Sequence, residues 1–272
     1  MIEAITNEAT AFIEQRWEDY TAEQHAVWKI LFNRRMGQLK EAGSKVFCEG
    51  IERIGLSENH VPNLEDVNRR LEALTGWRAV PVSGFLDAKL FFKCLAQRRF
   101  PTTVIIRRMD QLDYLPEPDI FHDVFGHVPL HSDPVFADFL QQFGAVAASA
   151  ETENEVKMLT RLFWFTVEFG LIEEEGKPKA YGSGLISSAA DCANALGPKC
   201  ERRPFSLDAI FAQDFEVSDL QNVLFVVKSF DELFAAAEQA KKMLLAGELR
   251  GNSSNQAVKM VMGCCGGHEH KH

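Results

Sequence analysis

The first hundred residues place apolar side chains three to four positions apart, which is the spacing of an amphipathic helix. Val27, Ile30 and Leu31 form the first clear run of this kind. Thr21 stands before the run and Gln24 occupies the third helical position, a pairing typical of a capping box. We therefore expect a helix to begin directly after Thr21.

Three further helices are predicted in this third of the chain. They cover residues 47–56, 63–74 and 88–97. Gly55 and Gly76 supply C-terminal stops for the first two of them. Between the second and the third, the stretch RAVPVSGFLD at 78–87 contains a proline and a glycine, and it predicts an irregular loop.

The rest of the chain contains two short runs typical of strands and four longer runs typical of helices. The strands are TTVIIRR at 102–108 and NVLFV at 222–226, and the helices cover 134–149, 155–174, 187–196 and 230–245. No internal repeat or linker divides the sequence, so residues 1–250 are interpreted as one domain. Periodicity is lost after residue 250, and residues 251–272 are expected to form a flexible tail.

Charge and composition narrow the class of protein. The 272 residues include 29 Lys and Arg against 39 Asp and Glu, a net charge of −10 without a long basic run, which argues against a nucleic-acid partner. No apolar stretch is long enough to span a membrane, and the acidic N-terminus lacks the features of a secretory signal, so we expect a cytoplasmic location. The six cysteines have irregular spacing, which favours reduced thiols.

Two histidines stand five positions apart in the segment PEPDIFHDVFGHVPL, at His122 and His127. On a regular α-helix their side chains would diverge by roughly 140°, so a continuous helix could not direct both to one ion. Gly126 permits unusual backbone conformations, and Pro129 disfavours helix at the residue before it. A helix that starts near Asp119 and breaks at Gly126 would let the imidazoles converge. The alternative is that both histidines are incidental to a turn.

Glu168 lies in a run from 162 to 171 that is apolar apart from Thr166. An ionised carboxylate there is costly unless it is paired, hydrogen-bonded or bound to a metal. An exposed edge or an ion pair with Arg161 would also compensate it. With the two histidines, Glu168 makes a 2-His-1-carboxylate set, which both Fe(II) oxygenases and hydrolytic zinc enzymes use. The aromatic residues that flank the set favour oxygen activation in a dry cavity, although such residues also pack cores.

Three strings carry a resemblance to a known family. PEPDIFHDVFGHVPL, FWFTVEFGL and KAYGSGLISS, in this order and spacing, resemble the pterin-dependent aromatic amino acid hydroxylases. The likeness is strongest to the single-domain bacterial phenylalanine 4-monooxygenases, and it extends from residue 17 to about residue 233.

The resemblance implies a mainly α catalytic domain with a few short β-strands. It implies Fe(II) held by His122, His127 and Glu168, with a tetrahydropterin and O₂ as co-substrates for the conversion of L-phenylalanine to L-tyrosine. Tryptophan or tyrosine hydroxylation on the same scaffold is the first alternative, because pocket shape sets the ring preference. A zinc-dependent hydrolase and a non-enzymatic protein with structural histidines are the others.

The family's substrate site maps onto this chain residue by residue. Arg107 matches an arginine that pairs with the substrate carboxylate, with Arg108 as the competing candidate. Asp119 matches a carboxylate that would orient an imidazole or fix Arg107, and it could also cap the helix that follows. The positions that line the amino acid pocket are matched by Trp164, Gly184 and Ser187.

The pterin site is implied in the same way. The loop VSGFLD matches the pterin-binding loop, whose backbone groups would read the pterin edge at Gly84, Phe85 and Leu86. Phe91 would stack on the pterin ring, although an apolar helix face is its ordinary setting. Tyr181 resembles a tyrosine near the pterin and the iron, and a lid residue is the alternative.

The sequence departs from the animal members in several ways. The likeness begins close to Met1 and no long coiled coil follows Leu233, so we expect a monomer or a homodimer rather than a tetramer. Leu115 stands where animal members carry a threonine, and Phe163 stands where a tyrosine is common. The end of the chain could bind a soft metal, or could simply be flexible, through Cys264, Cys265, His268, His270 and His272.

Overall fold

The computed structural model describes residues 4–113, 117–217, 219–251 and 261–262. The α-helices of this part are α1 (Glu8–Ala11), α2 (Ala22–Ala42), α3 (Lys45–Arg53), α4 (Leu64–Thr75), α5 (Ala88–Ala96), α6 (Pro134–Ala148), α7 (Glu153–Phe163), α8 (Ser183–Ser187), α9 (Ala189–Leu196), α10 (Leu207–Ala212) and α11 (Phe230–Leu245). The segments Phe121–His127 and Trp164–Glu168 are π-helical. Short 3₁₀ turns cover Trp17–Asp19, Met109–Gln111 and Val128–Ser132. The mainly α fold with few short strands is thus confirmed.

The strands form one sheet and two short pairs. They are β1 (Arg78–Pro81), β2 (Leu86–Asp87), β3 (Arg99–Thr102), β4 (Leu171–Glu174), β5 (Lys177–Ala180), β6 (Glu201–Pro204), β7 (Val223–Val227) and β8 (Val261–Met262). The sheet has the order β5-β4-β7-β6, in which β4 runs antiparallel to β5 and parallel to β7, and β6 runs parallel to β7. β1 pairs in parallel with β3, and β2 pairs antiparallel with β8.

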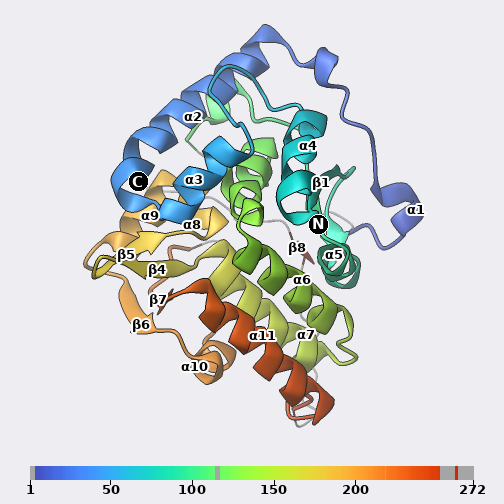
Figure 1. Ribbon diagram of the computed structural model, residues 1–272, viewed down its shortest axis with the longest axis vertical. Helices are drawn as coiled ribbons and strands as arrows, with labels where there is room; N and C mark the ends of the chain where they lie inside the picture. Colours follow the sequence, from blue (N-terminus) through green and yellow to red (C-terminus); the bar gives the residue numbers. More distant parts are fainter. Residues whose placement is uncertain (1–3, 114–116, 218, 252–260, 263–272) are drawn as a thin grey trace.

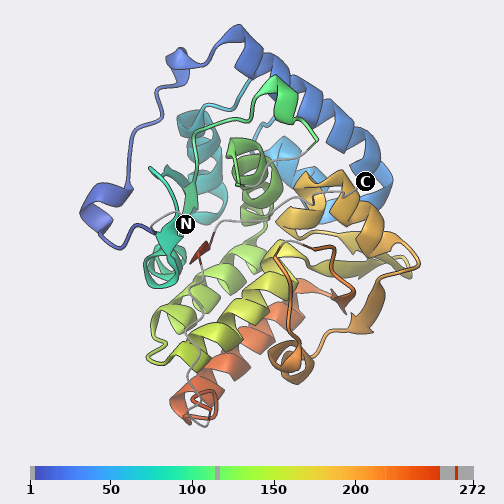
Figure 2. The same ribbon diagram turned by 180° about the vertical axis from the view of Figure 1, so that it is seen from behind.

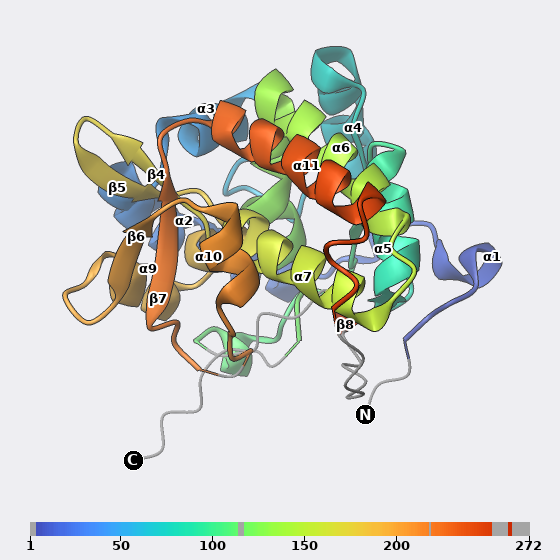
Figure 3. The same ribbon diagram turned by 90° about the horizontal axis from the view of Figure 1, so that it is seen from below.

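The sheet lies at one side of the molecule and a helical layer lies at the other (Figures 1 and 3). In that layer α5 and α11 both pack on α6, and α6 contacts α7. The second π-helical segment follows α7 and leads toward β4. Glu168, its last residue, therefore stands where the helical layer meets the sheet.

Local capping signals determine where several helices begin and end. Both hydrogen bonds of the predicted capping box between Thr21 and Gln24 are present at the start of α2. Asn63 caps α4, and Gly76 ends it in the left-handed region with a φ of 76°. These boundaries agree with the sequence prediction because each depends on residues within one helical turn.

The strand predicted at 102–108 is wrong. The observed strand is β3, which ends at Thr102, and residues 103–108 belong to no strand. Their backbone N–H groups donate instead to carboxylates, from Thr103 to Asp123 Oδ2 at 2.6 Å and from Arg107 to Asp119 Oδ2 at 3.0 Å. The segment is therefore fastened to the π-helix that carries the two histidines.

Two other boundaries also differ from the prediction. The stretch 78–87 is not wholly irregular, because β1 and β2 occupy its ends and pair with distant strands. The helix predicted at 155–174 ends earlier, since it becomes π-helical after Phe163 and leaves the helix at Phe169. A Cβ at Gly170 would lie 2.1 Å from the Tyr181 ring, so this glycine allows β4 to start beside β5.

The tail predicted at 251–272 lies mostly outside the described residues, as do its Cys and His side chains. Its described strand β8 pairs with β2. Figure 2 shows this strand as a short dark red arrow, and flexibility of the remainder stays a prediction. None of the helices in the described ranges combines the length and apolar character needed to cross a membrane.

His131 is a buried polar residue within the aromatic core. Its ring stacks on Trp77 with 4.7 Å between ring centroids and is tilted against Phe100 at 4.8 Å. Neither ring nitrogen has a hydrogen-bond partner among the described residues. Burial, with a smaller contribution from His127, lowers the pKa of His131 well below its ordinary value. The ring is therefore neutral and serves as packing.

Replacing His131 by Phe is expected to raise the free energy of unfolding by about 1 kcal/mol, because it removes two unpaired buried polar atoms and keeps the stacked ring. Urea denaturation followed by circular dichroism measures the change. His131→Leu is the control, since it also removes the nitrogens but loses the stacking, and it should be less stable than His131→Phe. A loss of stability in His131→Phe would mean that a bound water pairs with the imidazole.

Candidate active site

His122 and His127 converge because the segment that carries them is a π-helix. Its i→i+5 hydrogen bonds bring residues five apart to the same side, which an α-helix does not do. The predicted helix break at Gly126 is therefore wrong, and the glycine has another role. A Cβ at Gly126 would lie 3.1 Å from the carbonyl oxygen of Ser183, so the glycine lets α8 approach closely.

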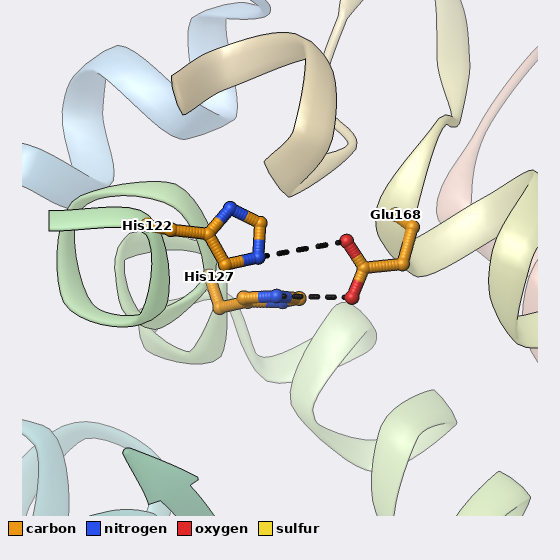
Figure 4. A group of neighbouring side chains, drawn as sticks. All are labelled: His122, His127 and Glu168. Atoms are coloured by element: carbon orange, nitrogen blue, oxygen red, sulfur yellow. Dashed lines mark ion pairs between the residues drawn. The ribbon is translucent and has the colours of Figure 1, made fainter. Parts of the chain in front are cut away.

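Glu168 faces the two imidazoles from the second π-helical segment (Figure 4). His127 Nε2 lies 3.2 Å from Glu168 Oε1, and His122 Nε2 lies 3.8 Å from Glu168 Oε2. The two imidazole rings are perpendicular, with 5.1 Å between centroids. One ligand atom from each residue lies within 4.8 Å of the others, and all three side chains are buried.

The electrostatics of the three residues suit a cation. Burial raises the pKa of Glu168, but the charge and hydrogen bond of His127, with His122 and Ser183, outweigh it and lower the pKa to about 2. Burial lowers the pKa of His122 to about 4 against the attraction of Glu168. His122 Nε2 has no hydrogen-bond partner within the described ranges. A neutral imidazole with a free Nε2 lone pair beside an ionised carboxylate is a donor set for a divalent metal.

Helix α8 supplies a hydroxyl group to two of the three residues. Ser183 Oγ donates to Glu168 Oε2 at 2.6 Å, and a hydrogen bond of 2.8 Å joins Ser187 Oγ to His122 Nδ1. Such partners fix the orientation of a ligand side chain and the tautomer of a histidine. The sequence prediction assigned Ser187 to the amino acid pocket and missed Ser183. The available signal was the spacing of four residues between them, which places both on the same side of a helix.

Asp119 and Arg107 form a buried, bidentate ion pair. Arg107 donates from Nε to Asp119 Oδ2 at 2.8 Å and from Nη2 to Oδ1 at 2.9 Å. The same carboxylate accepts the backbone N–H of His122 at 3.1 Å. Asp119 thus makes two of the contacts considered from the sequence, the one that fixes Arg107 and the one that caps the following helix. The competing Arg108 is exposed and pairs with Asp110.

A pocket beside the candidate metal ligands, which are His122, His127 and Glu168, is lined by the predicted pterin loop. Its wall includes Gly84, Phe85, Leu86 and Phe91 together with His127 and Glu168. The N-terminal segment supports this loop from behind, since the Ile5 N–H donates to the Phe85 carbonyl at 2.7 Å and the Asp87 N–H donates to the Ile5 carbonyl at 3.0 Å. Four of the predicted pterin-site residues therefore line one pocket, next to His127 and Glu168.

Asp123 is a wall residue of the same pocket that sequence reasoning missed. Burial raises the pKa of its carboxyl to about 7, although the Thr103 N–H donates to it. The available signal resembled the one used for Glu168, because Asp123 is an acidic residue with the apolar neighbours Phe121, Val124 and Phe125.

Two predicted residues of the amino acid pocket pack together near the ligand set. Trp164 lies 4.7 Å from the Phe169 ring and is stacked on Phe215 at 4.3 Å. A Cβ at Gly184 would lie 2.9 Å from Phe169 Cζ, so only glycine fits without displacing that ring. Arg161, the alternative partner for Glu168, instead donates to the Phe211 carbonyl and pairs with Asp214.

Two other aromatic candidates lie elsewhere, and Leu115 falls outside the described residues. Tyr181 is fully buried against Phe136 and Phe230 and does not line the pocket. Its hydroxyl has no hydrogen-bond partner in the described part of the chain. Phe163 packs edge to face on Phe91 at 5.6 Å, behind the pocket wall.

Comparison with known proteins agrees with this geometry. A sequence profile described as biopterin-dependent aromatic amino acid hydroxylase matches residues 13–261. The chain is 41% identical to a phenylalanine-4-hydroxylase of Mesorhizobium japonicum, over 82% of this chain and 81% of that protein. It is 40% identical to the phenylalanine-4-hydroxylase of Chromobacterium violaceum, over 85% and 79%. A crystal structure of the Chromobacterium enzyme with bound iron(III) and 7,8-dihydrobiopterin superposes with a TM-score of 0.83, at 38% identity and 89% coverage of both chains.

Proposed function

The chain belongs to the biopterin-dependent aromatic amino acid hydroxylases. From this membership we infer that it hydroxylates L-phenylalanine to L-tyrosine at a mononuclear iron, with a tetrahydropterin as co-substrate. The observation that carries the inference is the buried set of His122, His127 and Glu168 in a chain that resembles phenylalanine-4-hydroxylases over most of its length.

We propose that these three side chains hold the iron. The donor set fits the ion, because His122 Nε2 is buried without a hydrogen-bond partner among the described residues and Glu168 is ionised. Two imidazoles and one carboxylate would leave other coordination positions of an Fe(II) ion open. When bound, the iron and the reduced pterin supply the electrons that activate O₂ for insertion of one oxygen atom. The chain's own residues orient the reactants and exclude water.

The amino acid is proposed to bind between Arg107 and the wall formed by Trp164 and Gly184. Among the described residues Arg107 donates hydrogen bonds from Nε, Nη2 and the backbone N–H, which leaves Nη1 for the substrate carboxylate. Asp119 holds the guanidinium in that orientation. The aromatic ring would then lie against Trp164.

The pterin is proposed to bind in the pocket lined by Gly84, Phe85, Leu86 and Phe91. Backbone groups of the loop would read the edge of the pterin, and Asp123 offers a carboxyl to its N–H groups. Phe91 lies at the wall and supplies an apolar face for the ring. This arrangement would put the pterin beside His127 and Glu168, which line the same pocket.

The test is an oxygenation assay with Fe(II), a tetrahydropterin and each of the three aromatic amino acids. We expect kcat/KM for phenylalanine to exceed that for tyrosine or tryptophan by at least about tenfold. With ¹⁸O₂, the product should carry one labelled oxygen. Tyrosine formed without O₂ or without pterin would overturn the proposal, and a preference for tryptophan or tyrosine would favour the alternative hydroxylase. Stoichiometric zinc in the purified protein, together with no oxygenation of any of the three amino acids, would favour a zinc-dependent hydrolase.

A further inference from the structure

Arg35 is a buried arginine of α2 whose side chain ends against α8. Only 4% of the residue is exposed. Its Nε donates to the carbonyl oxygen of Ile186 at 2.7 Å, and its Nη2 donates to that of Leu185 at 3.0 Å. Nη1 donates to the side chain of Gln38, one turn further along the same helix. The planar guanidinium therefore joins α2 to two consecutive backbone carbonyls of α8.

The contact matters because α8 is too short to be stable alone. It has five residues, and the last four carbonyl groups of any helix lack partners within the helix. Arg35 supplies donors to two of these carbonyls. Burial of a guanidinium is costly unless it is hydrogen-bonded, and burial lowers the pKa of Arg35 although Cys192 and Asp191 oppose the shift. An apolar side chain of similar volume would fill this space without the cost of burying a charge, so the guanidinium must do more than fill volume.

The two carbonyls lie between the two hydroxyl groups that contact the ligand set. Ser183, at the start of α8, donates to Glu168, and Ser187, at its end, is hydrogen-bonded to His122. A shift of α8 would therefore move both hydrogen bonds at once. Figure 1 shows α2 running along the side of the molecule where α8 and α9 lie, and α2 contacts both helices.

We propose that Arg35 is a positioning residue of the iron site, which fixes α8 so that Ser183 and Ser187 orient Glu168 and His122. The inference rests on the proposed iron ligands. It predicts that loss of the guanidinium fork weakens metal binding in a protein that is still folded. Residues that are hydrogen-bonded to metal ligands typically contribute about 10- to 100-fold to the metal affinity. Arg35 acts through two such residues, Ser183 and Ser187.

The test uses Co(II) as a probe with the apoprotein, and a competing chromophoric chelator reports the dissociation constant. Arg35→Met removes the charge, and Arg35→Lys keeps the charge but loses the fork. We expect both to raise the Kd for Co(II) by about 10-fold or more and to change the visible Co(II) spectrum. Millimolar guanidinium should partly restore the affinity of Arg35→Ala.

Arg34→Met is the matched control, because Arg34 is the neighbouring residue, is exposed and pairs only with Asp113 at 3.0 Å in the described structure. Its Kd should equal that of the unaltered protein. If the Arg35 variants do not fold, the exposed Gln38→Met, which removes the partner of Nη1, should still raise the Kd severalfold. Unchanged affinity and spectrum in folded Arg35→Lys, or in Gln38→Met, would overturn the proposal. Failure of the unaltered protein to bind Co(II) would instead contradict the proposed iron site.

Discussion

Replacing Glu168 by Gln is expected to lower the affinity for Fe(II) by at least about 100-fold and to reduce turnover to about 1% or less, since a directly bound ligand contributes more than the partners behind it. Gln has the same shape and can still accept from Ser183, so the change removes chiefly the negative charge. That charge is available at neutral pH, because the pKa of Glu168 is about 2. The two imidazoles would then have to hold the cation without a negatively charged ligand.

Iron content after gel filtration and the rate of tyrosine formation measure the two effects. Glu173→Gln is the matched control, because it makes the same change five positions further on, at an exposed site of β4. It should retain both iron and activity. A Glu168→Gln protein that keeps stoichiometric iron and more than half of its activity would remove Glu168 from the ligand set.

The sequence was informative wherever the physical cause was local. Thr21 and Asn63 begin helices because their side chains cap the next turn, and Gly76 ends one because it adopts a left-handed conformation. Glu168 could be selected because a charge in an apolar run needs compensation whatever the fold. These inferences required no knowledge of distant contacts.

The π-helical geometry could not be read from the sequence. Apolar spacing reports an average period of 3.6 residues, and it does not show where the hydrogen-bond pattern lengthens by one residue. His122 and His127 therefore suggested a broken helix, whereas the chain keeps its helical turn and widens it. Strands β1 to β6 were missed for a related reason, since each of them is defined by a partner distant in sequence or by a tight hairpin.

The direction in which each side chain points also could not be predicted from the sequence. KAYGSGLISS places Tyr181, Ser183 and Ser187 within seven residues, yet Tyr181 enters the core and both serines turn to the ligand set. The direction depends on Gly182, where a Cβ would lie 2.3 Å from the backbone nitrogen of Gly170. Close approach of these two backbone segments determines which side chains face the proposed metal ligands.

Replacing Asp119 by Asn is expected to lower the free energy of unfolding by about 3 to 5 kcal/mol, because it leaves the Arg107 guanidinium without its charged partner in a buried site. The side chains of Asp119 and Arg107 are only 2% and 11% exposed. The KM for phenylalanine should rise by about tenfold or more, since Arg107 would no longer be held toward the substrate carboxylate. Urea denaturation and steady-state kinetics measure the two effects.

The effect of Asp119→Asn on stability should depend on pH. Burial raises the pKa of Asp119, but the hydrogen bonds and charge of Arg107 outweigh it, so the folded-state pKa lies below the ordinary value of 3.8. A lowered pKa stabilises the folded state above the ordinary value, and the contribution is lost as the pH falls through the folded-state pKa. The difference between the two proteins should therefore be constant from pH 7 to about pH 5 and narrow below 3.8.

Asp110→Asn is the matched control for Asp119→Asn, because Asp110 also makes a bidentate pair with an arginine. Arg108 donates to it at 3.0 and 2.8 Å, in nearly the geometry of the buried pair. The side chains of Arg108 and Asp110 are 71% and 68% exposed, so water screens their interaction, and its loss should lower the stability much less than loss of the buried pair. Equal losses in the two variants would mean that burial does not set the strength of the Asp119–Arg107 pair. An unchanged KM in Asp119→Asn would show that Arg107 reaches the substrate without Asp119.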